Sequence, residues 1–359
     1  MNDEFYRRLA RRLDAIPLGF SSTESGVELR LLAKMFTPEE ALLASVMRLT
    51  PEAASDIASR ADIDFEDAQK HLDEMVSKGL IYADTGEDRV TFGLKDFLDF
   101  NFEQLPRLDK EWAQILEQYM QETEGGSIVN DPPPVFRIIP VDESISRDAT
   151  ILPYEQASEL VEEAKSWAVR DCFCRVQRQL IGKGCDHPTE TCLRLAPYEA
   201  FFEESDVDRL LTKEDALNLL KLASESGLVH TTENQRDGHW IICNCCTCSC
   251  TFLRTISEFG HLYPIAYSDF RSTVNERICD GCGDCIEYCQ FGAMLLSGGK
   301  CLVDNSRCNG CGLCIASCPT DAIQLERVPN SESVTPPTNQ HEWMLQRSEA
   351  RGISLSDIV

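Results

Sequence analysis

The sequence predicts a protein of mixed α+β class built from several domains. At 359 residues, of which 43% are hydrophobic, the chain is long enough for two or three compact domains with cores of their own. Helix-period apolar patterns dominate its first third, strand-like segments follow in the middle, and a repeated cysteine pattern occupies the last part. A segment rich in glycine and proline separates the first of these regions from the second. We therefore expect domains at 1–124, 136–270 and 271–328, a linker at 125–135, and a linker with a docking tail at 329–359.

Residues 37–94 carry the pattern of three short helices followed by a hairpin. The first helix begins with a capping box at Thr37, with proline at its first helical position, and the third is expected over 64–78. Two strand-like segments, 80–83 and 89–92, flank a short turn. This order resembles a winged helix, which implies a domain that binds either DNA or another protein.

The charges of this region argue against DNA. The helix that would enter the groove carries six acids against two lysines, namely Asp62, Asp64, Glu66, Asp67, Asp73 and Glu74 against Lys70 and Lys78. Basic side chains that displace counterions supply much of the affinity for DNA, so this face repels phosphate. The whole chain has a net charge of −26, which disfavours nucleic acid and favours a basic partner. We expect the winged-helix-like domain to dock a protein; a DNA-binding regulator is the alternative.

The sequence also bears on the compartment of the protein. It shows no secretory signal pattern, and no apolar run approaches the roughly 20 residues needed to cross a bilayer. Its 18 cysteines lie in metal-type spacings rather than in dispersed pairs. We therefore expect a cytoplasmic protein with reduced thiols and no membrane insertion, from an organism that lives with little oxygen.

The segment 136–270 is expected to be an α+β domain rich in cysteine. Its patterns predict one helix over about 154–170 and another from the Thr212 cap to Gly227. Two strands near 228–230 and 239–242 are expected to form a hairpin, which leads directly into a dense cysteine segment.

Nine cysteines of this domain form two sets. The first set is Cys172, Cys174, Cys185 and Cys192, and the second is Cys243, Cys245, Cys246, Cys248 and Cys250. The second set is too dense to be core packing alone, because free cysteines so close together form disulfides or bind soft metals. Either each set holds a metal centre, or the two combine into one site with spare thiols. An additional iron–sulfur cluster, zinc and redox-active thiols all remain open.

Three residues near these cysteines carry weaker expectations. His187 and His230 are expected to be structural, since a lone histidine is more often hydrogen-bonded than metal-bound. Arg175, next to Cys174, is expected either to donate an N–H group to a cluster sulfide or to form a surface salt bridge.

The stretch from Cys279 to Cys318 is a duplicated unit. Four cysteines recur 29 residues later in the same spacing: Cys279, Cys282, Cys285 and Cys289, then Cys308, Cys311, Cys314 and Cys318. Three thiolates spaced C-x2-C-x2-C converge on one cubane, and the fourth ligates the cluster of the other half. One [4Fe–4S] cluster is therefore assigned to Cys279, Cys282, Cys285 and Cys318, and a second to Cys308, Cys311, Cys314 and Cys289. Paired zinc knuckles are disfavoured, because structural zinc needs no third evenly spaced thiol.

This spacing resembles the bacterial two-cluster ferredoxin family. The resemblance implies two low-potential clusters that pass one electron at a time. Pro319 follows Cys318 as the motif expects, whereas Gln290 stands where the first half would carry its proline, and the leftover Cys301 is expected to pack. Combined with the winged-helix-like start and the CxCR and CNCC elements, the unit resembles iron–sulfur proteins of anaerobic bacteria and archaea.

These observations predict an iron–sulfur electron carrier or electron-transfer subunit of an oxidoreductase. Its expected partner is a flavoprotein or another oxidoreductase. The alternatives are a redox-responsive winged-helix regulator and an enzyme with an open-site cluster in the middle domain. The sequence lacks a dinucleotide fingerprint, a P-loop and a nucleophile elbow, so no catalytic residue is predicted.

Overall fold

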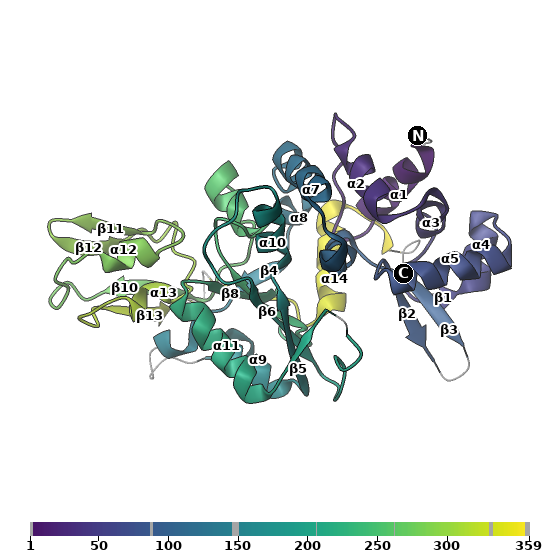
Figure 1. Ribbon diagram of the computed structural model, residues 1–359. Coiled ribbons are helices and arrows are strands. Elements are labelled where there is room, and N and C mark those ends of the chain that lie inside the picture. The colour runs from purple at the N-terminus through teal and green to yellow at the C-terminus, as the bar shows by residue number, and fades with distance from the viewer. Residues whose placement is uncertain are drawn as a thin grey trace. The chain divides into compact units, whose positions relative to one another are not determined.

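The computed structural model describes residues 3–86, 89–145, 151–205, 207–261, 263–329 and 333–355. The chain divides into two compact units (Figure 1), of which the first comprises Met1–Pro132 with Met344–Val359 and the second Pro133–Trp343. Within the described residues, no helix is both long enough and apolar enough to cross a membrane.

The first unit is mainly helical. Its helices are α1 (Glu4–Asp14), α2 (Val27–Met35), α3 (Pro38–Ala44), α4 (Ala54–Ala61), α5 (Phe65–Ser77), α6 (Phe97–Glu103), α7 (Lys110–Thr123) and α8 (Gly126–Asn130), with a 3-10 turn at Leu105–Arg107. The last helix, α14 (Gln340–Arg351), begins in the second unit and ends in the first. A small antiparallel sheet has the order β1-β3-β2, formed by β1 (Glu52–Ala53), β2 (Ile81–Thr85) and β3 (Val90–Leu94).

The three helices and the hairpin expected over 37–94 are present as α3, α4, α5 and the β2–β3 pair. The predicted capping box is confirmed: the Thr37 side chain accepts from the Glu40 N–H group, and the Glu40 carboxylate accepts from the Thr37 N–H group. Resemblance to a winged helix stays a prediction, because element order alone does not establish a fold family.

Helices α8 and α14 lie where the sequence led us to expect linker and tail. Arg347 of α14 is fully buried, and its guanidinium donates to the backbone oxygens of Pro17, Ser127 and Asp131. These bonds join the segment after α1 and the end of α8 to α14. The end of the chain is therefore part of the first unit, while its role in docking a partner stays a prediction.

The second unit contains a six-stranded antiparallel sheet with the order β4-β8-β9-β6-β5-β7. Its strands are β4 (Phe136–Ile138), β5 (Ser166–Asp171), β6 (Glu190–Ala196), β7 (Arg209–Leu211), β8 (Val229–Glu233) and β9 (Ile241–Cys245). Helices α9 (Ala157–Glu163) and α11 (Lys213–Glu225) cover one face, where Leu160, Leu193, Leu220 and Ile242 form its core. Helix α10 (Phe173–Leu180) lies on the other side of the sheet (Figure 1).

Two predictions for this region have different outcomes. The helix capped by Thr212 and the β8–β9 hairpin are confirmed. The helix expected over 154–170 is wrong beyond Glu163, because Ser166–Asp171 forms strand β5 and pairs with β6 on one side and β7 on the other. Trp167 and Val169 suit a pleated sheet, and pairing on both edges outweighs the helical spacing of the apolar residues.

The duplicated cysteine unit folds as two small layers. Strands β10 (Phe270–Val274) and β13 (Ile323–Arg327) form one antiparallel pair, and β11 (Met294–Ser297) and β12 (Lys300–Val303) form the other. Short helices α12 (Asp284–Tyr288) and α13 (Leu313–Ala316) follow the two cysteine loops. Remaining turns of the second unit are 3-10 segments at Asp142–Ser144 and Pro153–Glu155 and a π-helical segment at Thr255–Phe259.

Candidate iron–sulfur and metal sites

Four thiols of the duplicated unit surround one small cavity. Cys279, Cys282 and Cys285 line it from one loop, and Cys318 lines it from the other half. The structure thus brings together the crossed set that the sequence pairs for the first cluster. Cys301 also lines this cavity.

The second crossed set also lies close together. Burial raises the pKa of the Cys314 thiol to about 12, and the neighbouring Cys308 and Cys289 thiols add to the shift. Burial likewise raises the pKa of Cys311, with further contributions from Cys314 and Cys289. Thiols packed so closely cannot all ionise unless positive charge is added, and iron would supply that charge. The donor set therefore fits a cluster.

The backbone supplies hydrogen bonds to both crossed ligands. The Ala293 N–H group donates to Cys289 Sγ, and the Ala322 N–H group donates to Cys318 Sγ, each at 3.2 Å. The two donors, like the two acceptors, are 29 residues apart. Bonds of this kind to the sulfur atoms are one of the features that set the reduction potential of a cluster.

Ser272 and Cys301 occupy equivalent places in the two halves. The two residues are 29 positions apart, and each donates its backbone N–H group to the first cysteine of the opposite half. Ser272 N–H donates to Cys308 Sγ, and Cys301 N–H donates to Cys279 Sγ, both at 3.5 Å. Their side chains contact the third cysteine of that same half. The distances are 3.2 Å from Ser272 Oγ to Cys314 Sγ and 3.3 Å from Cys301 Sγ to Cys285 Sγ.

The side chains of strand β9 point alternately to the two faces of the sheet, and this divides the middle cysteines into two groups. Because successive side chains of a strand point to opposite faces, Cys243 and Cys245 lie on the face away from α9 and α11. Cys246 follows the strand and packs on the other side, against Ala223 and Leu228. The structure therefore forms two groups, each of which draws on both sequence sets. Neither arrangement considered from the sequence alone describes this division.

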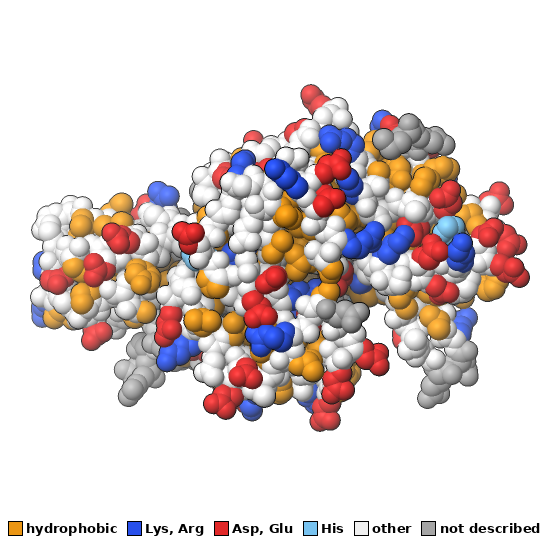
Figure 2. Space-filling model, in the orientation of Figure 1, with side chains coloured by type: hydrophobic (Ala, Val, Ile, Leu, Met, Phe, Trp, Pro, Cys, Tyr) orange, Lys and Arg blue, Asp and Glu red, His pale blue; other side chains and the backbone are white. Residues whose placement is uncertain are grey.

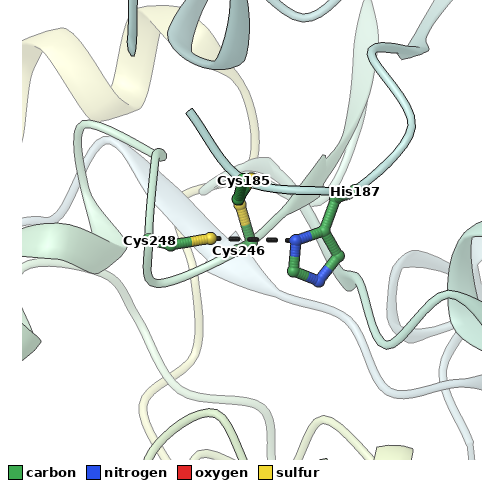
Figure 3. A group of neighbouring side chains, drawn as sticks. All are labelled: Cys185, His187, Cys246 and Cys248. Carbon is green, nitrogen blue, oxygen red and sulfur yellow. Dashed lines mark hydrogen bonds between the residues drawn. The ribbon is translucent and has the colours of Figure 1, made fainter. Parts of the chain in front are cut away.

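The first group contains a histidine. Cys185, His187, Cys246 and Cys248 place their ligand atoms within 4.8 Å of one another and could hold a metal ion (Figure 3). A hydrogen bond with Cys246 raises the pKa of His187 to about 9, and interaction with Cys248 lowers the pKa of Cys246 to about 3. His187 thus lies in a group of possible ligands, and the expectation that it is only structural stays a prediction. One residue separates His187 from Cys185, as one residue separates Cys246 from Cys248, and this spacing was the signal available in the sequence.

The second group contains six thiols between the sheet and the start of α10. They are Cys172, Cys174, Cys192, Cys243, Cys245 and Cys250, linked through mutual effects on their pKa values. Cys172 lowers the pKa of Cys174, and Cys174 raises that of Cys172. Cys243 lowers the pKa of Cys245, while Cys192 and Cys245 raise that of Cys243. Only some of these thiols can ionise at once, so the group has the donor chemistry of a second centre that needs cations.

Arg175 lies between the two groups and is buried. Its Nη1 atom donates to the Asn244 carbonyl oxygen at 2.9 Å and lies 3.8 Å from Cys246 Sγ, and Nη2 donates to the Thr191 hydroxyl. With only 1% of its surface exposed, this arginine cannot form a surface salt bridge, and that expectation is wrong. His230, by contrast, is structural as expected, since its Nδ1 lies 2.6 Å from Asn244 Oδ1.

The side chain of Gln290 connects the duplicated unit to the middle domain. The Thr247 N–H group donates to Gln290 Oε1 at 2.7 Å, and Gln290 Nε2 donates to the Gly227 carbonyl oxygen. Thr247 lies in the turn between Cys246 and Cys248, and Gln290 follows Cys289. The residue that departs from the expected proline thus fixes the second crossed set beside the middle cysteines.

Comparisons with known proteins add one finding. The family model of the 4Fe-4S binding domain matches residues 302–324, which include Cys308, Cys311, Cys314 and Cys318. This match supports a ferredoxin-type iron–sulfur motif in this part of the chain, with at least one [4Fe–4S] cluster and a general role in electron transfer. No curated protein sequence matches the chain.

Proposed function

We propose that this chain is an electron-transfer protein, or the electron-transfer subunit of an oxidoreductase, with two [4Fe–4S] clusters. The observation that carries the proposal is the cavity lined by Cys279, Cys282, Cys285 and Cys318, because it joins residues of both halves around one space. When bound, each cluster accepts or releases a single electron. The chain holds the ligands in fixed loops and donates N–H groups to their sulfur atoms.

The two clusters would differ in their surroundings. Cys282 of the first set is exposed, which suits exchange of electrons with a partner protein. The second set faces the middle domain, since the Val141 N–H group donates to the Cys311 carbonyl oxygen at 2.9 Å. Gln290 brings the same set near the middle thiols. We infer an electron route from the partner to the first cluster and from there to the second.

The charge of the chain favours a basic partner. Asp62, Asp64, Glu66, Asp67 and Asp73 are exposed around α5, and Figure 2 shows acidic side chains gathered over α4 and α5. Such a surface attracts a positively charged protein at low ionic strength and repels nucleic acid. We propose a flavoprotein or another oxidoreductase as the partner, in the cytoplasm.

The test is metal analysis combined with electron paramagnetic resonance on anaerobically purified full-length protein. The ferredoxin unit should contribute about eight iron atoms and eight sulfides per chain, four of each for every cubane. Cys282→Ala and Cys311→Ala should each remove one cluster and stop electron transfer to the partner. Ser77→Ala, at the end of α5 in the first unit, is the control. Full iron content in both cysteine variants would contradict the proposed ligands, and unchanged transfer would contradict the route.

A further inference from the structure

We propose that Cys185, His187, Cys246 and Cys248 form a closed site for a single Zn²⁺ ion, separate from the iron–sulfur clusters. The site ties the loop between α10 and β6 to the turn that follows β9. It takes no part in carrying electrons, because Zn²⁺ has no redox chemistry under these conditions.

The distances fit a tetrahedral ion. With Zn–S bonds of about 2.3 Å and a Zn–N bond of about 2.1 Å, neighbouring ligand atoms of a tetrahedron are about 3.6–3.8 Å apart. Cys185 Sγ lies 3.9 Å from Cys246 Sγ, and Cys248 Sγ lies 3.7 Å from His187 Nδ1. These two contacts share no atom and form opposite edges of the tetrahedron. Figure 3 shows the thiols of Cys246 and Cys248 and the imidazole turned toward one common space.

The ligands come in two pairs from separate loops. Each pair has one intervening residue, so both members can face the same ion from a single turn. Ser249 Oγ lies 3.4 Å from Cys185 Sγ and would orient this ligand as an outer-layer partner. Cys246 forms a buried apolar cluster with Ala223 and Leu228, and the partly buried Cys185 and Cys248 pack against this cluster. The cluster shields one side of the site from water.

The charge of Arg175 fits the same ion. Three thiolates and Zn²⁺ have a combined charge of −1, and the buried guanidinium lies 3.8 Å from Cys246 Sγ. Its other described partners are a carbonyl and a hydroxyl group, and in the described part of the chain no carboxylate pairs with it. A buried cation without a counter-charge is costly, so an anionic metal–thiolate group accounts for an arginine at this place.

A single ion suits this group better than a cubane does. Ligands of a four-iron cluster attach to separate iron atoms, so their sulfur atoms must be spread more widely than ligands around one ion. Here all four ligand atoms lie within 4.8 Å of one another. Three thiolates and one imidazole in a closed set are typical of structural zinc. The six-thiol group has no histidine and would remain for iron.

The experiment measures zinc and iron together on the full-length protein after anaerobic purification. We expect about one zinc per chain, with a zinc-edge absorption spectrum that indicates three sulfur ligands and one nitrogen ligand. His187→Ala should lose at least about 90% of the zinc, a tenfold change in occupancy, and keep all of its iron. His187→Cys should retain the zinc with a spectrum of four sulfur ligands. His71→Ala, a histidine of the first unit, is the matched control and should resemble the wild type.

Two results would overturn the proposal. One is wild-type protein without zinc that also fails to bind Zn²⁺ or Co²⁺ added during refolding. The other is loss of iron rather than zinc in His187→Ala, which would assign the site to an iron–sulfur cluster. Should His187→Ala fail to fold, the ligand signature of His187→Cys decides the question, because a change from three to four sulfur ligands occurs only if residue 187 binds the ion. Iron bound by the duplicated unit is counted separately, so failure here leaves the proposed function intact.

Discussion

At the scale of single residues, the two halves of the duplicated unit differ by one atom at an informative position. Ser272 and Cys301 are equivalent in sequence offset and in backbone contacts, yet one presents a hydroxyl and the other a thiol to the third cysteine of a set. Cys301 is buried, as the expected packing role requires. Its place in the wall of the cavity also makes it part of the electrostatic environment of the proposed first cluster.

Cys301→Ser should raise the reduction potential of the first cluster and leave that of the second unchanged. The Cys285 thiol donates to Cys301 Sγ in the structure, but a Cys285 thiolate bound to iron can only accept, so residue 301 becomes the donor. A hydroxyl group is a stronger donor than a thiol, and hydrogen bonds to cluster sulfur stabilise the more negative reduced state. The measurement is a redox titration followed by electron paramagnetic resonance. Ser272→Cys is the mirror-image control and should lower the potential of the other cluster. Equal shifts of both clusters in either variant would contradict the equivalence of the two positions.

At the scale of secondary-structure elements, α14 shows how a terminal helix is held in place. Three backbone oxygens from segments far apart in the sequence converge on the Arg347 guanidinium, and Trp343 Nε1 donates to the Pro134 carbonyl oxygen at 3.0 Å. A delocalised guanidinium with several donors can satisfy such a set, whereas a lysine offers a single point of attachment. The helix is therefore held by polar contacts as well as by apolar packing.

Arg347→Met should release α14 from the first unit without affecting the metal centres. The substitution removes three hydrogen bonds, to the backbone oxygens of Pro17, Ser127 and Asp131, and we expect a loss of about 3 kcal/mol in the local stability of the helix. Amide hydrogen exchange over residues 340–351 would measure it as faster exchange in the variant. Leu345→Ala, an exposed position on the same helix, should exchange like the wild type. Equal protection of the helix in Arg347→Met would show that its apolar contacts suffice.

At the scale of the whole molecule, Gln290 joins two regions of the second unit that carry different cysteine patterns. Its amide oxygen accepts from the Thr247 N–H group, in the turn that carries Cys246 and Cys248. Its amide nitrogen donates to the carbonyl oxygen of Gly227, just after α11. A proline at this place would supply neither contact, because it has no polar side chain. The departure from the ferredoxin motif is thus a connection between the duplicated unit and the middle domain.

Gln290→Pro should leave two [4Fe–4S] clusters in place and free the turn at Thr247. We expect at least a tenfold increase in the exchange rate of the Thr247 amide, which corresponds to about 1.4 kcal/mol of lost protection. Gln290→Glu keeps an acceptor for Thr247 and should preserve most of its protection. If Gln290→Pro instead lost iron, the glutamine would be needed for assembly of the second cluster. Unchanged exchange at Thr247 would show that this contact is not formed in solution.

Local patterns in the sequence determined much of this protein. The cysteine spacing of the duplicated unit, the capping boxes at Thr37 and Thr212, and the β8–β9 hairpin all depend on residues that are near one another in the chain. Covalent spacing and local hydrogen bonding limit such segments to few conformations, so their form can be predicted without knowledge of the rest.

Only the tertiary structure decided how the middle cysteines divide and which other residues join them. Strand β9 sends Cys245 and Cys246 to opposite sides, and partners from distant loops complete each group. The grouping of His187 with three thiols, the burial of Arg175 and the strand at Ser166–Asp171 were missed for the same reason. Each depends on pairing between segments far apart in sequence, where the energy of sheet formation and burial outweighs local preference.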